Sequence, residues 1–439
     1  MMQDSMMQDK NTRSVIVVWC TLSIGVACLL MTGHAVPRVE AADPLGSNTR
    51  LATYDTATGD TFFALSLVPQ VEVPAVRACD VIVLFDTSAS QTGAYRTESL
   101  EVLQAALGQL HEDSRVRLYA IDLLPMSMND ALVAATDPAI LKAMDLLSQR
   151  IPLGATDLAV GLREASKAFP KRSPRPRRVI YIGDGISRAN ILQVEEFREL
   201  AEQLVTQRIS ISSFATGPQL DFQMLAALAN HTGGMIYVDR PELSPQQAGT
   251  ALAVASQQGV FWPVSNRLPE ALQEVFPQRV PPLRADRDSI LIGKLQRGES
   301  LKTRLKVELD GRQTQLAWEI APEKSSEAFN FLPQLVKEAR VSQGWSLPTA
   351  GSAGLREVAR LISSSAQELI QFAQRAFKNG DLEGANTVAD AVLRRDPGNP
   401  DAEAIKRVIR KKKRESAVPR TSRKKNPLRS GGSSNRPRR

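Results

Sequence analysis

Residues 81–90 read VIVLFDTSAS: five consecutive apolar residues, then Asp86, then Ser88 and Ser90 at alternate positions. A short apolar run bounded by polar residues is typical of a strand that is buried on both faces. A carboxylate and two hydroxyls at the end of such a strand are costly to bury unless they find partners. The polar end of this strand is therefore the first place to look for chemistry.

Apolar segments of the same kind recur along the chain, with helical patterns between them. The further candidate strands are residues 116–121, 178–183, 209–215 and 235–238. The candidate helices are residues 98–110, 138–149, 157–169, 194–207 and 222–230. Short apolar strands alternating with helices of about 10–15 residues predict parallel pairing, with helices on both faces of the sheet. We therefore expect a doubly wound, mostly parallel α/β domain of Rossmann-like type over residues 60–262.

After this domain the sequence predicts first a β unit and then a helical region. Residues 283–321 contain two β-rich segments joined by Asp310-Gly311, a dipeptide typical of tight hairpin turns, and predict a small β unit. Residues 331–410 predict a helical region that contains a flexible stretch, WSLPTAGSAG (345–354). Small and large apolar residues at helical spacing on both sides of Asn379-Gly380-Asp381 resemble a tetratricopeptide-type hairpin, and a plain helical hairpin explains them equally well.

The first 41 residues predict a signal peptide. Two basic residues precede the apolar run 15–32, and Val39-Glu40-Ala41 offers small residues to a signal peptidase. The alternative is an uncleaved membrane anchor, since the run is just long enough to span a bilayer. Either way we expect the protein to be exported, whether periplasmic, cell-surface or secreted. Cleavage would leave Cys79 as the only cysteine, so no internal disulfide could form, and we expect Cys79 to be a small buried hydrophobe.

The net charge of +8 comes from the C-terminal end of the chain. Residues 406–439 carry 15 Lys or Arg and one acidic residue, whereas the rest, with 40 basic and 46 acidic side chains, is net negative. Residues 411–439 are too charged and too rich in Pro, Gly and Ser to bury a core, so we expect a disordered basic tail. Such a tail could contact an anionic envelope polymer or lipid, or simply be solvated. Nucleic acid is a poor partner, because no aromatic residue follows Phe377 to stack on bases.

Three strand-end loops carry oxygen side chains. Asp86, Ser88 and Ser90 follow the first strand, Thr156 lies in a loop before a helix, and Asp184 follows the strand 178–183. In an open parallel sheet, ligands bind at the carboxyl ends of the strands. Two carboxylates and three hydroxyls form an all-oxygen set that suits Mg²⁺, or alternatively Mn²⁺ or Ca²⁺, and is poor for Zn²⁺. An octahedral Mg²⁺ would keep a position for one oxygen from outside, such as a partner's carboxylate.

The pattern Asp86-x-Ser88-x-Ser90, then Thr156, then Asp184 resembles the metal-ion-dependent adhesion site of von Willebrand factor A domains. The resemblance implies that Ser88 and Ser90 bind the metal directly, Thr156 directly or through water, and the two aspartates often through water. The preceding segment FFALSLVP is similar to the lead-in strand of bacterial exported relatives of the inter-alpha-trypsin inhibitor heavy chains. One departure is Ala89, where the family usually has Gly; its side chain need not touch the metal.

Asp86 and its serines could instead simply cap a helix. A phosphatase of the haloacid dehalogenase type would use an aspartate at a strand end as nucleophile, but it needs acids where this chain has Ser88 and Arg188. Neither His111 nor His231 lies in a loop that could complete a Ser-His-Asp site, and we expect both at the surface or at a helix end.

We therefore expect a non-catalytic, exported binding protein whose cation engages an Asp or Glu of a protein partner. The alternatives are a structural scaffold of the cell envelope with an incidental cation site and, less favoured, a metal-dependent phosphotransferase.

Overall fold

A computed structural model describes residues 49–71, 78–265, 267–296, 300–395 and 399–417. The predicted signal peptide and residues 418–439 of the predicted tail lie outside these ranges. Within them, no helix combines the length and the apolar character that crossing a membrane requires.

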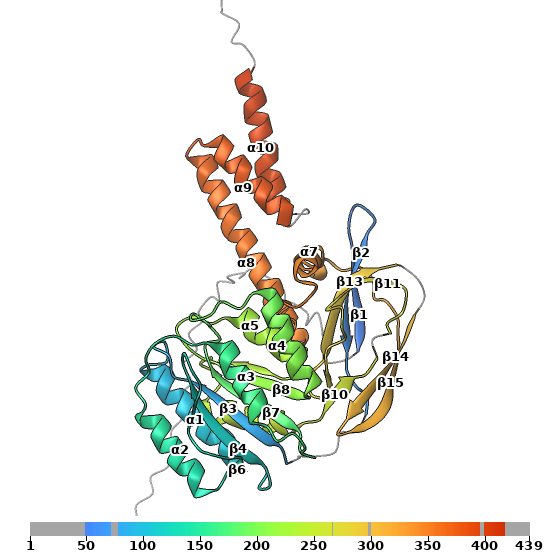
Figure 1. The fold of residues 1–439 in the computed structure, drawn as a ribbon. Helices are drawn as coiled ribbons and strands as arrows, with labels where there is room; N and C mark the ends of the chain where they lie inside the picture. The colour runs from blue at the N-terminus through green and yellow to red at the C-terminus, as the bar shows by residue number, and fades with distance from the viewer. Residues whose placement is uncertain (1–48, 72–77, 266, 297–299, 396–398, 418–439) are drawn as a thin grey trace, which may run out of the picture. The chain divides into compact units, whose positions relative to one another are not determined.

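The larger sheet contains the five strands that the sequence predicts. These are β3 (Asp80–Asp86), β4 (Arg115–Ile121), β7 (Arg177–Gly183), β8 (Ile209–Ala215) and β9 (Ile236–Val238). They pair in parallel in the order β4-β3-β7-β8-β9 (Figure 1). Two short strands that the sequence did not indicate, β5 (Met126–Ser127) and β6 (Val133–Ala134), pair antiparallel with β4 and make the sheet mixed. The predicted α/β fold class is confirmed.

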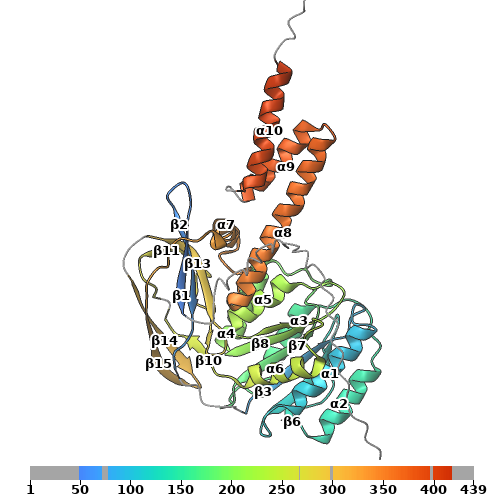
Figure 2. The ribbon, with the colours of Figure 1, turned by 180° about the vertical axis from the view of Figure 1, so that it is seen from behind.

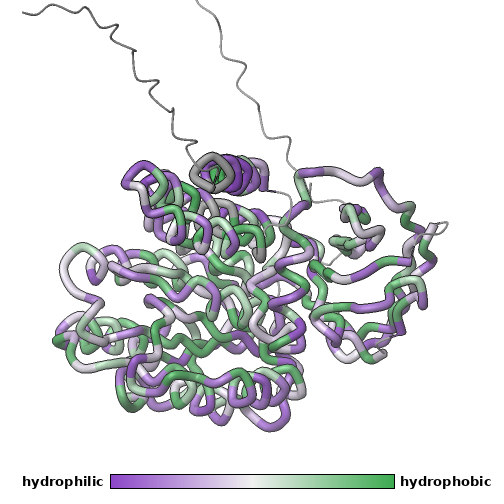
Figure 3. Tube along the Cα trace, turned by 90° about the horizontal axis from the view of Figure 1, so that it is seen from above, coloured by the Kyte–Doolittle hydropathy of each residue, from purple (hydrophilic) through white to green (hydrophobic). Residues whose placement is uncertain are grey.

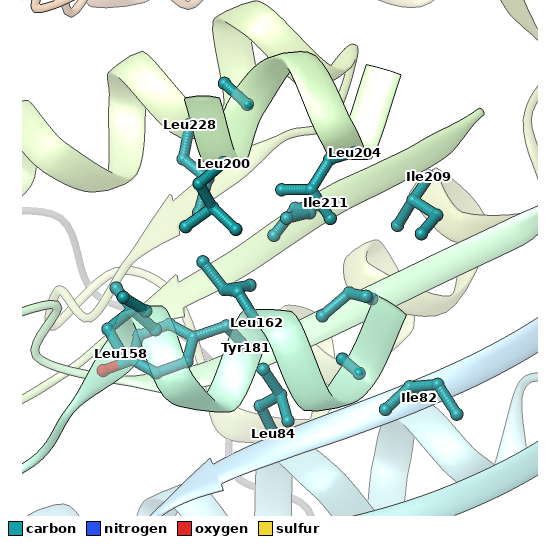
Figure 4. Close-up of a cluster of buried hydrophobic side chains, with 14 of the residues drawn as sticks. Ile82, Leu84, Leu158, Leu162, Tyr181, Leu200, Leu204, Ile209, Ile211 and Leu228 are labelled. Carbon is teal, nitrogen blue, oxygen red and sulfur yellow. The ribbon is translucent and has the colours of Figure 1, made fainter. Parts of the chain in front are cut away.

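Helices cover both faces of this sheet, which Figures 1 and 2 show from opposite sides. One face packs against α3 (Leu158–Ala168), α4 (Val194–Thr206) and α5 (Phe222–Thr232). The other packs against α1 (Ala94–Gly108), α2 (Pro138–Gln149) and α6 (Pro245–Gln257). Side chains alternate between the faces because successive strand residues point to opposite sides: Ile82 and Leu84 join the first core, and Val81, Val83 and Phe85 join the second. Figure 4 shows part of the first core.

The order of the strands places a switch point between β3 and β7. From β3 the chain crosses through α1 to β4 on one side, and from β7 it crosses through α4 to β8 on the other. Connections that leave in opposite directions open a crevice at the carboxyl ends of the two strands, which is the usual ligand position in such sheets. Asp86 ends β3 and Asp184 directly follows β7, so both carboxylates lie at this crevice.

Another hydrophobic core, distinct from the two cores on the faces of the larger sheet, lies in a β-sandwich. This sandwich is larger than the predicted unit 283–321. One sheet has the order β1-β2-β13-β11 and the other β12-β10-β14-β15, all antiparallel. The bounds are β1 (Arg50–Asp55), β2 (Thr61–Leu67), β10 (Val260–Pro263), β11 (Leu272–Phe276), β12 (Leu283–Arg284), β13 (Ser289–Leu295), β14 (Leu301–Leu309) and β15 (Arg312–Ile320). The predicted hairpin turn is present between β14 and β15, where Asp310 and Gly311 both have positive φ.

The lead-in strand belongs to the sandwich. The α/β domain was expected to begin at residue 60, but β2 pairs along its whole length with β1 and β13 and not with the larger sheet. Its residues Phe63 and Leu65 pack in the sandwich core with Leu291 of β13 and Leu305 of β14. The pairing of β2 with β13 joins residues more than 200 positions apart in the sequence. Local sequence patterns therefore cannot predict it.

The described residues that follow β15 are mainly helical. The helices are α7 (Leu332–Ser342), α8 (Gly351–Lys378), α9 (Leu382–Arg395) and α10 (Pro400–Ala417), with one 3-10 turn, η1 (Glu327–Phe329). The turn at residues 379–381 lies where it was predicted, and α8 and α9 form a helical hairpin; its tetratricopeptide character stays a prediction. Figure 3 shows hydrophobic and hydrophilic residues alternating along much of the described chain.

The stretch 345–354 is not the flexible link that its composition indicated. Thr349, Ala350 and Ser352 are buried, and α8 begins at Gly351. The buried carboxylate of Asp288 accepts hydrogen bonds from the Ser352 hydroxyl and from its backbone N–H (2.8 Å). Small polar residues here serve close packing at the start of a helix.

Candidate functional site

The structure brings the five predicted site residues together at the switch point. Asp86, Thr156 and Asp184 are at most 2% exposed, Ser88 is buried, and Ser90 is half-buried. The loop of Ser88 and Ser90 is tied to the loop before Thr156 by a backbone bond from Ala89 N–H to Gly154 O (3.1 Å). The three loops therefore converge, as expected from the sequence.

One hydrogen-bond network joins the five side chains. The Thr156 hydroxyl donates to Asp86 Oδ1 (2.8 Å), and the Ser88 backbone N–H donates to the same oxygen (2.8 Å). The hydroxyls of Ser88 and Ser90 lie 3.0 Å apart, and Ser90 donates to Asp184 Oδ2 (2.6 Å). The two carboxylates are thus connected through the backbone N–H and hydroxyl of Ser88 and the hydroxyl of Ser90.

Tyr181 belongs to the site, although no pattern in the sequence pointed to it. It lies on β7 beside Leu158 and Leu162 in the first core (Figure 4). Its hydroxyl donates to Asp86 Oδ2 (3.0 Å) and accepts from Gly185 N–H (2.9 Å). Both carboxylate oxygens of Asp86 therefore accept hydrogen bonds within the protein. The alternation of side chains along β7 could have placed Tyr181 on the same face of the sheet as the buried leucines. It could not have shown that the Tyr181 hydroxyl bonds to Asp86.

Gly183 makes room for this arrangement. A Cβ at this position would lie 2.5 Å from the Asp86 Cβ and 2.5 Å from the Tyr181 hydroxyl, closer than real Cβ contacts. The close approach of β7 to the Asp86 side chain thus requires glycine.

The surroundings of Asp86 disfavour its ionised form. Burial raises the pKa of Asp86 to about 6, and the negative charge of Asp184 acts in the same direction. The hydrogen bonds from Ser88 and Thr156 lower the pKa and offset part of this shift. Burial also raises the pKa of Tyr181 well above its ordinary value, so its hydroxyl stays a donor. Among the described residues, no Lys or Arg forms an ion pair with either carboxylate.

Helix capping does not explain these residues. The N-cap of α1 is Gly93, which makes no side-chain capping bond, and the N-cap of α4 is Gln193. In contrast, Asp157 and Asp221 are true caps, each accepting a bond from the first turn of its helix. Neither site carboxylate therefore serves as the N-cap of a helix.

The donor set fits a hard divalent cation. Three hydroxyls and two carboxylates offer only oxygen, as Mg²⁺, Mn²⁺ and Ca²⁺ prefer. In the described part of the chain, no cluster of three or more His, Cys, Asp or Glu forms a different type of metal site. The residues that could hold the ion are Asp86, Ser88, Ser90, Thr156 and Asp184.

A phosphatase or hydrolase reaction finds little support in the geometry. Arg188, where a phosphatase of the haloacid dehalogenase type needs an acid, is exposed and donates to Gln219 (3.2 Å). His231 lies at the end of α5 as expected but is buried, because Trp345 covers it at 4.5 Å between ring centroids. Cys79 is fully buried, as predicted, and burial raises the pKa of its thiol.

The fold is that of a doubly wound α/β domain, with a set of oxygen donors at its switch point. Within the chain, residues 79–238 match the family model of the von Willebrand factor type A domain. This range contains all five candidate residues, so the chain contains a von Willebrand factor type A domain, a class that commonly mediates protein interactions. No curated protein matches the chain.

Solved structures with a similar fold include von Willebrand factor type A domain proteins. One is a von Willebrand factor type A protein from Catenulispora acidiphila, with 12% identity, coverage of 84% of this chain and 91% of that one, and a TM-score of 0.43. Another is the ArnB paralog VWA2 from Sulfolobus acidocaldarius, with 15% identity, coverage of 82% and 92%, and a TM-score of 0.37. At these scores the likeness gives no information about function.

Proposed function

We propose that this protein binds a divalent cation at Asp86, Ser88, Ser90, Thr156 and Asp184 and uses the ion to engage an acidic group of a partner protein. The observation that carries the proposal is the pair of buried carboxylates, connected through Ser88 and Ser90 and forming no ion pair with a Lys or Arg of the described residues. Burying two carboxylates in this way is unfavourable unless a cation compensates them.

The roles of the side chains follow from their bonds. Asp86 already accepts three hydrogen bonds, from Thr156, Ser88 and Tyr181, so it supplies charge and holds the hydroxyls in place. The half-buried Ser90 and its neighbour Ser88 present hydroxyl oxygens at the mouth of the crevice. Mg²⁺ is the first candidate, with Mn²⁺ and Ca²⁺ as alternatives, because the set is small and contains oxygen alone.

Partner recognition follows from incomplete coordination. Mg²⁺ takes six ligands in near-octahedral geometry and usually keeps several waters, so an Asp or Glu from outside can replace one. We propose that this exchange happens outside the cytoplasm, since residues 1–41 have the order of a signal peptide. The basic C-terminal segment would add a contact with an anionic envelope polymer or lipid.

Calorimetric titration with Mg²⁺ and Mn²⁺ tests the proposal. The wild-type chain should bind one ion, and the double variant Ser88→Ala/Ser90→Ala should lose this binding while keeping its thermal stability. Ser148→Ala, which removes an exposed hydroxyl at the end of α2, is the matched control and should bind normally. No ion binding by the wild type, or equal binding by the double variant, would favour a structural scaffold.

A further inference from the structure

Large apolar side chains are exposed on the loops that flank the proposed cation site. Among the described residues, seven exposed large hydrophobics lie on these loops or on the elements that directly continue them, β5 and the start of α4, and we call them the apolar collar. They are Leu123, Leu124, Met126, Ile151, Leu153, Ile191 and Val194. Four are 70–81% exposed. Isolated exposed hydrophobics are common on proteins, but a group on one functional edge indicates a contact surface.

The collar shares its loops with the site residues. Ile121, at the end of β4, is the register partner of Asp86, and Leu123 follows it by two residues. Leu153 precedes Thr156 by three residues, and Ile191 lies in the loop that begins with Asp184. The collar thus lies at the same carboxyl edge of the sheet as the cation site.

These loops are held in place by hydrogen bonds. Arg150 donates to Asp122 Oδ2 (2.5 Å) and to the Thr87 hydroxyl (3.1 Å), joining the loops after β3, after β4 and before α3. Leu153 N–H donates to Thr87 O (2.9 Å), and Ala189 N–H donates to Thr156 O (3.2 Å). A preorganised surface loses little entropy when a partner binds.

A small hollow adjoins the collar at Val194. It has a volume of about 160 Å³ and is lined mainly by apolar side chains, among them Leu192, Phe197 and Met224. Asp221, also in its wall, donates its backbone N–H to the backbone oxygen of Asp184 (2.9 Å), so one wall of the hollow is tied to the loop that begins with Asp184. A space of this size can accept part of one apolar side chain.

We propose that the collar sets the specificity of the cation site: the partner is a polypeptide segment in which the acidic residue is flanked by large apolar residues. This inference rests on the proposed function, since the ion supplies the contact for the carboxylate. The collar adds contact for the flanking residues, and the hollow takes one of them. A carboxylate in a purely polar segment would leave the collar in water and bind more weakly.

Two other occupants fit less well. An anionic bilayer would need several Lys or Arg around the apolar residues. Arg150 is paired with Asp122, which leaves Arg188 as the exposed cation among the described residues of these loops. A second copy of the chain would need an acidic residue that reaches the site of its neighbour. Both are outcomes that the following experiment distinguishes.

The test uses the full-length chain, immobilised and loaded with Mg²⁺, and a peptide library with a fixed central Asp and randomised flanks. Recovered peptides should be enriched in Leu, Ile, Phe and Met near the Asp, and chelation should abolish recovery. The double variant Ile151→Ser/Leu153→Ser should bind an enriched peptide at least about tenfold more weakly. Its calorimetric Mg²⁺ binding should be unchanged, and Val341→Ser, an exposed apolar residue of α7, is the matched control.

The failures are distinguishable. Mg²⁺-dependent recovery without apolar enrichment, or with equal binding by the double variant, overturns the role of the collar and leaves the proposed function standing. Recovery that is the same with chelator overturns the proposed function. Collar-dependent binding to anionic vesicles, or collar-dependent self-association in sedimentation, without peptide enrichment overturns the polypeptide partner.

Discussion

His231 should make the stability of the protein strongly dependent on pH. Its Nε2 hydrogen-bonds the carbonyl of Trp345 (3.0 Å), and its ring packs against the rings of Trp345 and Phe197. Burial lowers the pKa of His231 from 6.5 to about 4, while hydrogen bonding to the backbone of Trp345 and Gly344 opposes the shift. The folded protein therefore keeps this imidazole neutral at pH values where the unfolded chain protonates it.

The size of the effect follows from this shift. Above pH 6.5 the imidazole is neutral in both states, and its stabilising contribution is fully present. As the pH falls from 6.5 to 4, the unfolded chain takes up a proton that the folded chain resists, so the free energy of unfolding decreases. A shift of this size corresponds to about 3 kcal/mol, with the loss complete near pH 4.

Urea unfolding of the wild type and of His231→Gln at pH values from 7 to 4 measures this contribution. The variant is expected to be less stable than the wild type at pH 7, because ring packing is lost, but to lose about 3 kcal/mol less on acidification. His111→Gln, which replaces a histidine whose side chain is one third exposed, is the control for the substitution itself. Parallel profiles for the wild type and His231→Gln would refute the reasoning.

Three further substitutions test other parts of the structure. Tyr181→Phe removes the hydroxyl that donates to the Asp86 carboxylate, so titration calorimetry should show a cation affinity lower by about 10–100-fold. An unchanged affinity would mean that this hydrogen bond does not orient the site. Arg284→Met removes the guanidinium donor of the buried Ala255 carbonyl and the ion-pair partner of Asp286, while the Gly233 carbonyl keeps the Ser210 hydroxyl as donor. This change should lower the free energy of unfolding by about 2–4 kcal/mol in urea, whereas exposed Arg304→Met should change it little. Gly249→Ala places a Cβ 2.4 Å from a backbone oxygen of α1 and should lower the melting temperature. In Gly161→Ala, the control, the new Cβ is 3.4 Å from its nearest neighbour, so the melting temperature should stay unchanged or rise. The reverse order of melting temperatures would contradict the close packing of α1 and α6.

The elements of the α/β domain could be predicted because their signals are local. The apolar run that ends in Asp86 and the similar run before Asp184 are strands in the structure, with ends within about one residue of those expected. The convergence of the site residues was also predictable, since the carboxyl ends of parallel strands meet at one edge. The helix α6 was missed, although Ser244 and Gln247 form a capping box that could have indicated its start.

The rest depends on contacts that no local pattern encodes. The strand β2 looked like the beginning of the α/β domain, but its partner β13 lies far along the chain. The stretch 345–354 looked like a linker because of its Gly, Ser and Pro, and the bonds from Ser352 to Asp288 fix it instead. The role of Tyr181 depends on a bond between neighbouring strands, which the sequence of one strand cannot show.

Diffraction from a crystal grown in Mn²⁺ tests the proposed cation site most directly, because anomalous scattering locates the ion independently of any assumed ligand. The account predicts one anomalous peak at the carboxyl ends of β3 and β7, with the Ser88 and Ser90 hydroxyls at coordination distances of about 2.1 Å. It also predicts a solvent molecule or an outside carboxylate on the same ion. A well-ordered crystal with no anomalous peak there, or with the peak held by other residues, would contradict it.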